Sequence, residues 1–176
     1  MNLKKTEIVN GLGFKSVFFV DQEGLKQGKS FIYAPNGNIV ESCFYLNDFK
    51  NGEYKSWWEN GNPCHFTTYS GPFTFHGLNV TWWENGIMSS RGEFINGKAH
   101  GVHEEWNQEG ILWQLLNYQY GIKEGVYNEW YLNGKSKIKA IYKNGLRENM
   151  YSEWDEDGNL IFQGIFTLDI LQHRFK

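Results

Sequence analysis

The chain has 176 residues, two cysteines and a formal net charge of −3 at pH 7. This length fits one ordinary domain or a short repeat array, two cysteines cannot build a disulfide framework, and the charge argues against nucleic-acid binding through bulk positive charge. Aromatic residues make up 18% of the sequence, beside 20 glycines and 3 prolines. Because aromatic residues favour strands and glycines close turns, this composition favours an all-β protein.

The first twenty residues do not resemble a targeting segment. Two lysines are followed by an apolar stretch, but Glu7, Asn10 and Lys15 interrupt it. Nowhere do eighteen apolar residues run together, so no membrane-spanning helix is predicted. We therefore expect a soluble, cytoplasmic protein.

A period of 24 residues dominates the chain after this segment. One series consists of Gly28, Gly52, Gly77, Gly101 and Gly125, with Asn149 at the next position. A second series follows nine residues behind the first, at Gly37, Gly61, Gly86, Gly110, Gly134 and Gly158. Both series share a single inserted residue between the second and third copies. Self-similarity at such a period predicts a repeat array.

The period divides the chain into hairpin-sized repeats. We expect a single repeat domain over residues 1–176, with repeats at 28–51, 52–76, 77–100, 101–124 and 125–148. Residues 4–27 match as a degenerate N-terminal repeat or cap, and residues 149–176 as a C-terminal repeat and cap. Degenerate terminal copies are typical of repeat arrays, whose ends face solvent.

Each repeat is predicted to contain two strands and two turns. Asn-Gly pairs such as Asn60-Gly61 are strong hairpin signals, because both residue types accept the positive φ of hairpin turns. A glycine every nine to fifteen residues interrupts any apolar stripe with helical spacing, so helices are not predicted. The predicted fold class is therefore all-β: an elongated single antiparallel meander of stacked β-hairpins.

The repeat unit Gly-x-x-x-x-Trp/Tyr-x-x-Asn-Gly, followed by Tyr-x-Asn-Gly-x-x-x-Gly, resembles the MORN repeat in its short bacterial variant. Matching stretches are GLNVTWWENG at 77–86, FINGKAHG at 94–101 and YKNG at 142–145. The resemblance covers about residues 28–166. The short variant occurs in proteins similar to the YwqK-type antitoxins, which this chain therefore also resembles. It implies a fold of MORN-like hairpins and a partner that such a protein would bind.

Alternation along each first strand predicts two faces, since successive side chains of a strand point to opposite sides. Counted from the first glycine, odd offsets hold the aromatic ladder and are expected to be buried, including Val80, Trp82, Val102 and Val126. Even offsets are expected to form the opposite, mixed face. Its predicted partner-binding residues are Tyr54, Trp58, Trp83, His103, Glu105, Tyr127, Glu129, Tyr131 and Glu153.

The second tryptophan of each Trp-Trp pair has three explanations at this stage. Trp58 and Trp83, like Tyr131, are either packing residues of a sheet covered on both faces, or rings of a protein-binding surface. A platform for stacking a small molecule or glycan is the third.

The glutamates at even offsets, Glu105, Glu129 and Glu153, have two interpretations. They either keep an extended sheet soluble or form a negative stripe for a basic partner. Lys135, Lys137 and Lys139 fall on the same side by alternation and partly neutralise that stripe.

No motif predicts catalysis, so the sequence is interpreted as a non-enzyme without cofactor. The chain has no phosphate-binding glycine loop and no nucleophile elbow. His100 and His103 lie close in sequence but lack further ligands for a zinc site, so no metal is expected.

The most specific functional prediction is a non-catalytic protein-binding scaffold, antitoxin- or immunity-like, that binds and blocks a partner enzyme. The alternatives are a general assembly scaffold and a membrane- or phospholipid-associated MORN protein. The membrane alternative lacks a polybasic cluster or lipidation signal. Direct nucleic-acid binding is not expected, and the sequence leaves the oligomeric state and the partner's identity open.

Overall fold

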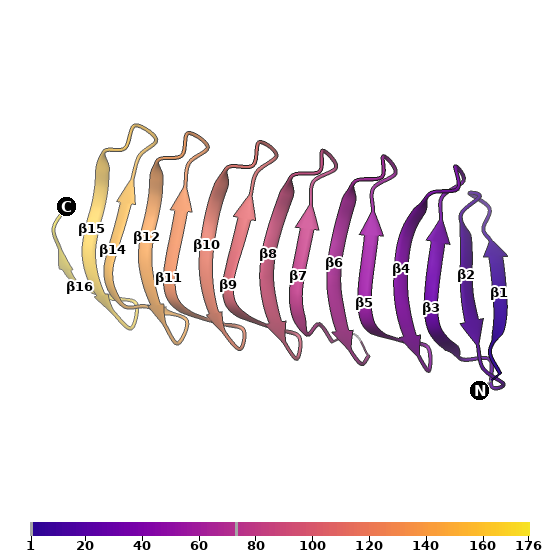
Figure 1. Ribbon diagram of the computed structural model, residues 1–176. Coiled ribbons are helices and arrows are strands. Elements are labelled where there is room, and N and C mark those ends of the chain that lie inside the picture. The colour runs from indigo at the N-terminus through magenta and orange to yellow at the C-terminus, as the bar shows by residue number, and fades with distance from the viewer. Residues whose placement is uncertain (1, 73) are drawn as a thin grey trace. The chain divides into compact units, whose positions relative to one another are not determined.

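The computed structural model describes residues 2–72 and 74–176, and these contain strands but no helix. The chain divides into two compact units, the first ending at Ile87 and the second beginning at Met88. Figure 1 labels the strands of each unit. The first contains β1 Lys4–Val9, β2 Lys15–Val20, β3 Lys26–Tyr33, β4 Ile39–Leu46, β5 Phe49–Trp57, β6 Pro63–Ser70 and β7 Gly77–Trp82. The second contains β8 Met88–Ile95, β9 Lys98–Trp106, β10 Leu112–Gln119, β11 Ile122–Trp130, β12 Ser136–Lys143, β13 Leu146–Arg147, β14 Asn149–Trp154, β15 Leu160–Thr167 and β16 Ile170–Arg174.

In each unit, consecutive strands pair antiparallel in chain order. In the first unit this holds from β1 to β7. In the second unit it holds from β8 to β16, with the short β13 pairing with β12 beside the main path. The predicted all-β antiparallel meander of stacked hairpins is confirmed. The repeat boundaries themselves remain a prediction.

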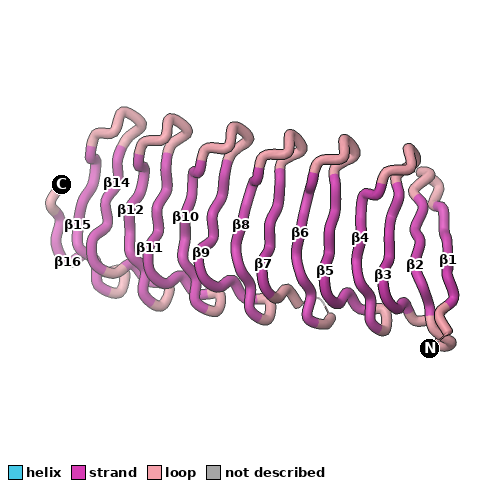
Figure 2. Tube along the Cα trace, in the orientation of Figure 1, coloured by secondary structure: helices cyan, strands magenta, loops and turns pink. Residues whose placement is uncertain are grey.

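One set of turns, at Asn36-Gly37, Asn60-Gly61, Asn85-Gly86 and Asn133-Gly134, closes hairpins at one end of the strands, where Figure 2 draws pink loops. In the first of them, the amide of Gly37 donates to Ala34 O over 2.9 Å, and Gly37 has a φ of +88°. The side chain of Asn36 accepts a hydrogen bond from the amide of Asn38. In these four turns the glycine supplies the positive φ, and the asparagine side chain accepts a hydrogen bond from the amide two residues on, in place of the positive φ expected for it.

The turns at the other end of the strands need positive φ at two successive residues. Asn96 and Gly97 have φ values of +50° and +76°, and Asn144 and Gly145 have +51° and +83°. This is the type I′ geometry, whose twist matches that of the flanking strands. The glycines that end these repeats are therefore explained by the positive φ that this type of turn requires.

In four of the repeats the first glycine lies inside a strand, opposite a register shift that marks a bulge. Gly28, Gly52, Gly101 and Gly125 have φ between +71° and +91°. Beside Gly52 the register against β4 shifts between Cys43 and Tyr45. Glycine is the residue type that takes this conformation without a steric penalty, which explains why glycine recurs at this position of the repeat.

A periodic series of buried residues runs along the second strands. Its members are Cys43, Thr67, Gly92, Leu116, Ala140 and Gly164, and all of them are buried. In the first unit, Tyr54 lies opposite Cys43 on one side and Thr67 on the other. In the second unit, Tyr127 lies between Leu116 and Ala140 in the same way. Rings of the first strands therefore cover mostly small residues of the second strands.

This arrangement corrects the predicted faces. The rings at even offsets lie on the side that holds the buried series of the second strands, whereas Val102 and Val126, expected to be buried, are 47% and 42% exposed. Val80 follows the prediction and is 4% exposed. Alternation shows which residues share a face, but it cannot show which face the large rings cover, because that depends on the residues opposite them on neighbouring strands.

Both cysteines are free, with Cys43 buried and Cys64 half-buried. Burial raises the pKa of the Cys43 thiol to about 11, so this side chain behaves as a small core residue.

Candidate functional site

The predicted glutamates of the second unit lie in one row across the strands. Gln114 of β10 pairs with both Glu105 and Glu129, and Ile138 of β12 pairs with both Glu129 and Glu153. Glu105, Glu129 and Glu153 are therefore brought to one level on one side of the strands. We call these three residues the glutamate row.

A row of rings runs beside the glutamate row. The hydroxyl of Tyr127 donates to Glu129 Oε2 over 2.7 Å, and that of Tyr151 donates to Glu153 Oε2 over 3.3 Å. Burial is the main cause of the raised pKa of Tyr127, and Glu129 adds to it. Two of the three glutamates are thus held in place by a neutral phenol.

His103, the predicted site residue of β9, is a packed side chain. Its ring lies edge-on between Phe94 and Tyr118, with centroid separations of 5.2 and 5.0 Å. Its Nε2 donates to the carbonyl oxygen of Glu93 over 2.9 Å. The ring also covers Gly92, where a Cβ atom would lie 2.2 Å from Nδ1. The site residue that sequence reasoning placed on an open surface is therefore held on several sides.

The lysines do not neutralise the glutamate row in the way alternation predicts. Lys139 pairs with Asn128 and Ser152, on the other face, and its ammonium lies 5.8 Å from the ring of Trp154. Lys135 lies in the turn and donates to the carbonyl oxygen of Asp157. Lys137 alone of the three bonds to the row, through Glu129 Oε1. That hydrogen bond is the main cause of the raised pKa of Lys137.

The predicted residues of the first unit are also partly enclosed. Tyr54 donates to Glu41 Oε2 over 3.1 Å, and the Lys50 ammonium lies 4.0 Å from the Tyr54 ring centroid. Trp58 is half-buried, and its Nε1 donates to the backbone oxygen of Trp82 over 3.1 Å. Trp83 is half-buried as well, and its backbone closes the turn at Ile87.

Tyr131 repeats the contact of Trp58 in the second unit. Its hydroxyl donates to the backbone oxygen of Trp154 over 2.8 Å. Each of these aromatic residues follows the ladder tryptophan of its own repeat and bonds to the ladder tryptophan of the next. The second aromatic residue therefore links successive hairpins, in addition to any role at a surface.

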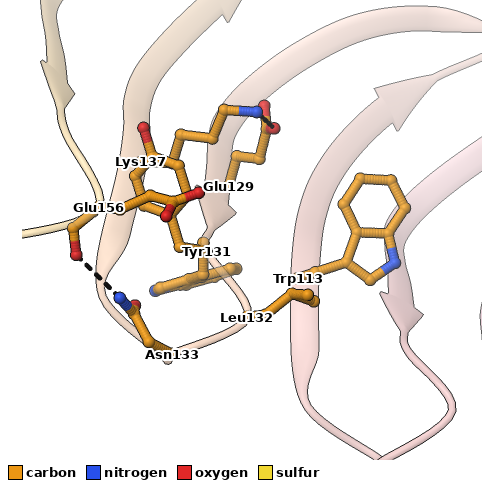
Figure 3. Close-up of a pocket in the computed structure, with 8 residues that line it drawn as sticks. Trp113, Glu129, Tyr131, Leu132, Asn133, Lys137 and Glu156 are labelled. Carbon is orange, nitrogen blue, oxygen red and sulfur yellow. Dashed lines mark hydrogen bonds and ion pairs between the residues drawn. The ribbon is translucent and has the colours of Figure 1, made fainter.

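Tyr131 also lines a pocket of about 450 Å³ in the second unit (Figure 3). The pocket lies where the β11–β12 turn approaches β10 and the turn after β14, and its lining residues are Trp113, Glu129, Trp130, Tyr131, Leu132, Asn133, Lys137 and Glu156. Leu132 is 68% exposed at the rim. On the other side of the turn, Asn133 donates from Nδ2 to the backbone oxygen of Glu156 over 2.8 Å. We call this the turn pocket.

Sequence reasoning identified two residues of the turn pocket, Glu129 and Tyr131, and missed its walls. Trp130 was assigned to the buried ladder. Trp113 and Lys137 lie at bulges of β10 and β12, where the register shifts. A bulge interrupts alternation, and no residue type marks these bulges in advance. The pattern therefore held no signal for Trp113, whereas alternation placed Lys137 on the side of the glutamates without indicating a pocket.

A smaller hollow of about 220 Å³ lies in the first unit, lined mainly by the rings of Trp57, Phe66 and Trp82. Its lining contains Lys55 and His65 but no carboxylate. Of these two hollows, the turn pocket is the one whose lining combines rings with acidic groups.

Within residues 2–72 and 74–176, no three His, Cys, Asp or Glu side chains converge in a way that would hold a metal ion. The described chain also has no helix that is long and apolar enough to cross a membrane. The absence of a cofactor and of an enzymatic activity remain predictions.

Comparison with protein families gives a match to a family model described as "MORN repeat variant". It covers residues 26–47, 50–64 and 123–144. The predicted resemblance to the MORN repeat is confirmed over these three stretches, one of which includes Tyr127, Glu129 and Tyr131. Repeats of this family generally bind proteins or membranes. A search of curated proteins finds no match to the chain.

Proposed function

We propose that this chain is a non-catalytic, protein-binding repeat scaffold, and that it acts as an antitoxin- or immunity-like protein that binds and blocks a partner enzyme. The observation that carries the proposal is the turn pocket, where three aromatic rings and an exposed leucine lie beside Glu129. Tryptophan and tyrosine dominate the binding energy of protein interfaces, which are anchored by buried rings in small pockets.

The contact surface that we propose extends from the turn pocket along the glutamate row. Glu105 and Glu153 flank Glu129 across five neighbouring strands. The first unit, taken by itself, offers a separate set of aromatic residues, Tyr54, Trp58 and Trp83, for which we propose the same kind of contact. The rings that are held by neighbouring residues lose little conformational entropy when a partner binds, which favours affinity.

The antitoxin-like role is supported by charge. A partner that acts on nucleic acid carries basic groups at its active site, and the glutamate row offers it carboxylates at regular spacing. Complementary charge speeds encounter and disfavours wrong partners. The resemblance to YwqK-type antitoxins points the same way, and a cytoplasmic location, testable by fractionation, is part of this proposal.

The test is an affinity pull-down from the native host, followed by assay of the purified partner with and without this chain. We expect one stoichiometric enzyme whose activity falls when the chain is added. Leu132→Asp should weaken capture, because it places a carboxylate at the apolar rim. Leu12→Asp is the matched control, since Leu12 is 78% exposed and lies outside the pocket.

Other outcomes distinguish the alternatives. Several weak partners, captured equally by wild type and Leu132→Asp, would favour a general assembly scaffold. Sedimentation with anionic vesicles that is lost in high salt would favour a membrane-associated protein. An enzyme that binds stoichiometrically but keeps full activity would retain the binding role and contradict the blocking role.

A further inference from the structure

Lys137 already places a cation inside the turn pocket. Its Nζ bonds to Glu129 Oε1 and lies 5.7 Å from the centroid of the Tyr131 ring (Figure 3). The carboxylate is well enclosed, with 14% of the Glu129 side chain exposed, whereas 39% of the Lys137 side chain is exposed. The acidic group is therefore fixed, and the lysine that covers it reaches solvent and can exchange.

The charges that line the turn pocket do not balance. Two carboxylates, Glu129 and Glu156, line it together with one ammonium group, that of Lys137. The formal charge of the lining is thus −2 + 1 = −1. One additional cation would neutralise it, and Trp113, Trp130 and Tyr131 line the same pocket with aromatic rings, the residue type that attracts cations.

We infer that the turn pocket receives an arginine side chain of the partner protein, whose guanidinium takes the place of Lys137 on Glu129 and lies against the surrounding rings. This inference rests on the proposed function, because it names the group by which the partner would be held. Arginine fits better than lysine, since its planar fork makes two parallel hydrogen bonds to a carboxylate and stacks on aromatic rings, whereas an ammonium acts as a point charge. A guanidinium can therefore displace the intramolecular lysine.

The full-length chain can be tested with a short glycine-flanked peptide that contains one arginine. The matched peptides carry citrulline, which has nearly the same shape without the charge, or lysine. Binding is followed through the indole N–H resonances of Trp113 and Trp130, assigned with Trp→Phe variants. We expect the arginine peptide to shift these resonances and to bind on the order of tenfold more tightly than either matched peptide.

Two variants examine the exchange itself. Lys137→Met removes the competing cation and should tighten arginine-peptide binding on the order of tenfold, whereas Glu129→Gln should weaken it by a similar factor. Lys55→Met is the control, since Lys55 also pairs with a glutamate, Glu53, and lies 5.5 Å from the centroid of the Phe66 ring, but in the first unit. It should leave arginine-peptide binding unchanged.

The outcomes separate this inference from the proposed function. If the three peptides bind alike, or none shifts the two indoles, or Lys137→Met leaves the affinity unchanged, the arginine site is overturned even when a partner enzyme is captured and blocked. If the arginine peptide binds as expected but the host yields no partner enzyme, the site stands and the proposed function fails. Glu129→Gln also replaces the charged acceptor of the Tyr127 hydroxyl by a neutral amide oxygen, so Lys137→Met decides the question if Glu129→Gln does not fold.

Discussion

The ring of His103 occupies the space that a side chain on Gly92 would need. A Cβ atom on Gly92 would lie 2.2 Å from Nδ1, 2.4 Å from Cε1 and 2.6 Å from Cγ of His103. The ring is also fixed by Phe94, Tyr118 and the carbonyl of Glu93, so it cannot move aside without losing those contacts. The packing of His103 in this repeat therefore requires that residue 92 has no side chain.

We predict that Gly92→Ala destabilises the protein by about 1–3 kcal/mol, the range for overpacking a filled site. Denaturant unfolding would measure the change. Gly11→Ala is the control, because nothing lies within 4 Å of a Cβ atom on Gly11. In the double variant Gly92→Ala/His103→Ala, much of the Gly92→Ala penalty should disappear, since the ring that clashes is gone. Additive effects of the two changes would contradict the packing explanation.

At the scale of the strands and turns, positive φ values set the shape of each hairpin. Asn149, which replaces the first glycine in the last repeat, has a φ of +65°, close to the +73° of Gly28. Asparagine enters this region more readily than other side chains, so it keeps the positive φ of the glycine that it replaces. The departure from the glycine pattern is thus a substitution that keeps the backbone conformation.

Asn149→Ala should therefore destabilise the protein by about 1–2 kcal/mol, since alanine carries the full penalty of the left-handed region. Asn149→Gly should be neutral or slightly stabilising. Thermal unfolding of both variants against wild type would measure this. Equal stability of the alanine and glycine variants would show that the conformation at this position does not limit stability.

Successive hairpins are also linked by side chains that bond to the backbone of the next repeat. Trp58→Phe removes the bond to Trp82, and Tyr131→Phe removes the bond to Trp154. Each should lower stability by about 0.5–1.5 kcal/mol, the usual net value of one hydrogen bond, while keeping an aromatic ring at the position. Urea unfolding would measure it, with Tyr120→Phe as the control, because that tyrosine is 53% exposed in a turn. No loss relative to this control would show that the links contribute little.

At the scale of the whole molecule, both units contain half-buried tyrosines. Burial raises the pKa of Tyr45 in the first unit and of Tyr151 in the second to about 12, and nearby Cys43 and Glu153 add to the respective shifts. Folding therefore favours the neutral phenol. This contribution is fully present below pH 10, the unshifted tyrosine value, and is lost as the pH rises from 10 toward 12.

We accordingly predict alkaline destabilisation that begins near pH 10. The free energy of unfolding should fall between pH 10 and pH 12, and tyrosinate absorbance should show the phenols of Tyr45 and Tyr151 titrating near 12. The double variant Tyr45→Phe/Tyr151→Phe should show a shallower fall over the same window. A fall of unchanged slope in that variant would assign the effect to other groups.

The parts that could be predicted are those that depend on neighbours in sequence. The glycine series, the Asn-Gly turns and the antiparallel order follow from local conformational preference and strand alternation. The glutamate row follows too, because equal offsets in successive repeats become equal levels on neighbouring strands. The wrong prediction for Val102 and Val126 came from taking the aromatic ladder as the buried side, when the small residues that rings cover lie on the other strand of each hairpin.

The sequence by itself determined that this is an all-β meander of stacked hairpins, because the φ values demanded by its glycines and the alternation of its strands are properties of short segments. Only the tertiary structure decided that Trp58 and Tyr131 bond to the next repeat, that Lys137 covers Glu129, and that Trp113 joins them at a pocket. These contacts join residues that lie on different strands, and two of the residues sit at bulges. Their geometry is fixed by the register of the strands and by the rings that cover neighbouring small residues, which no single segment specifies.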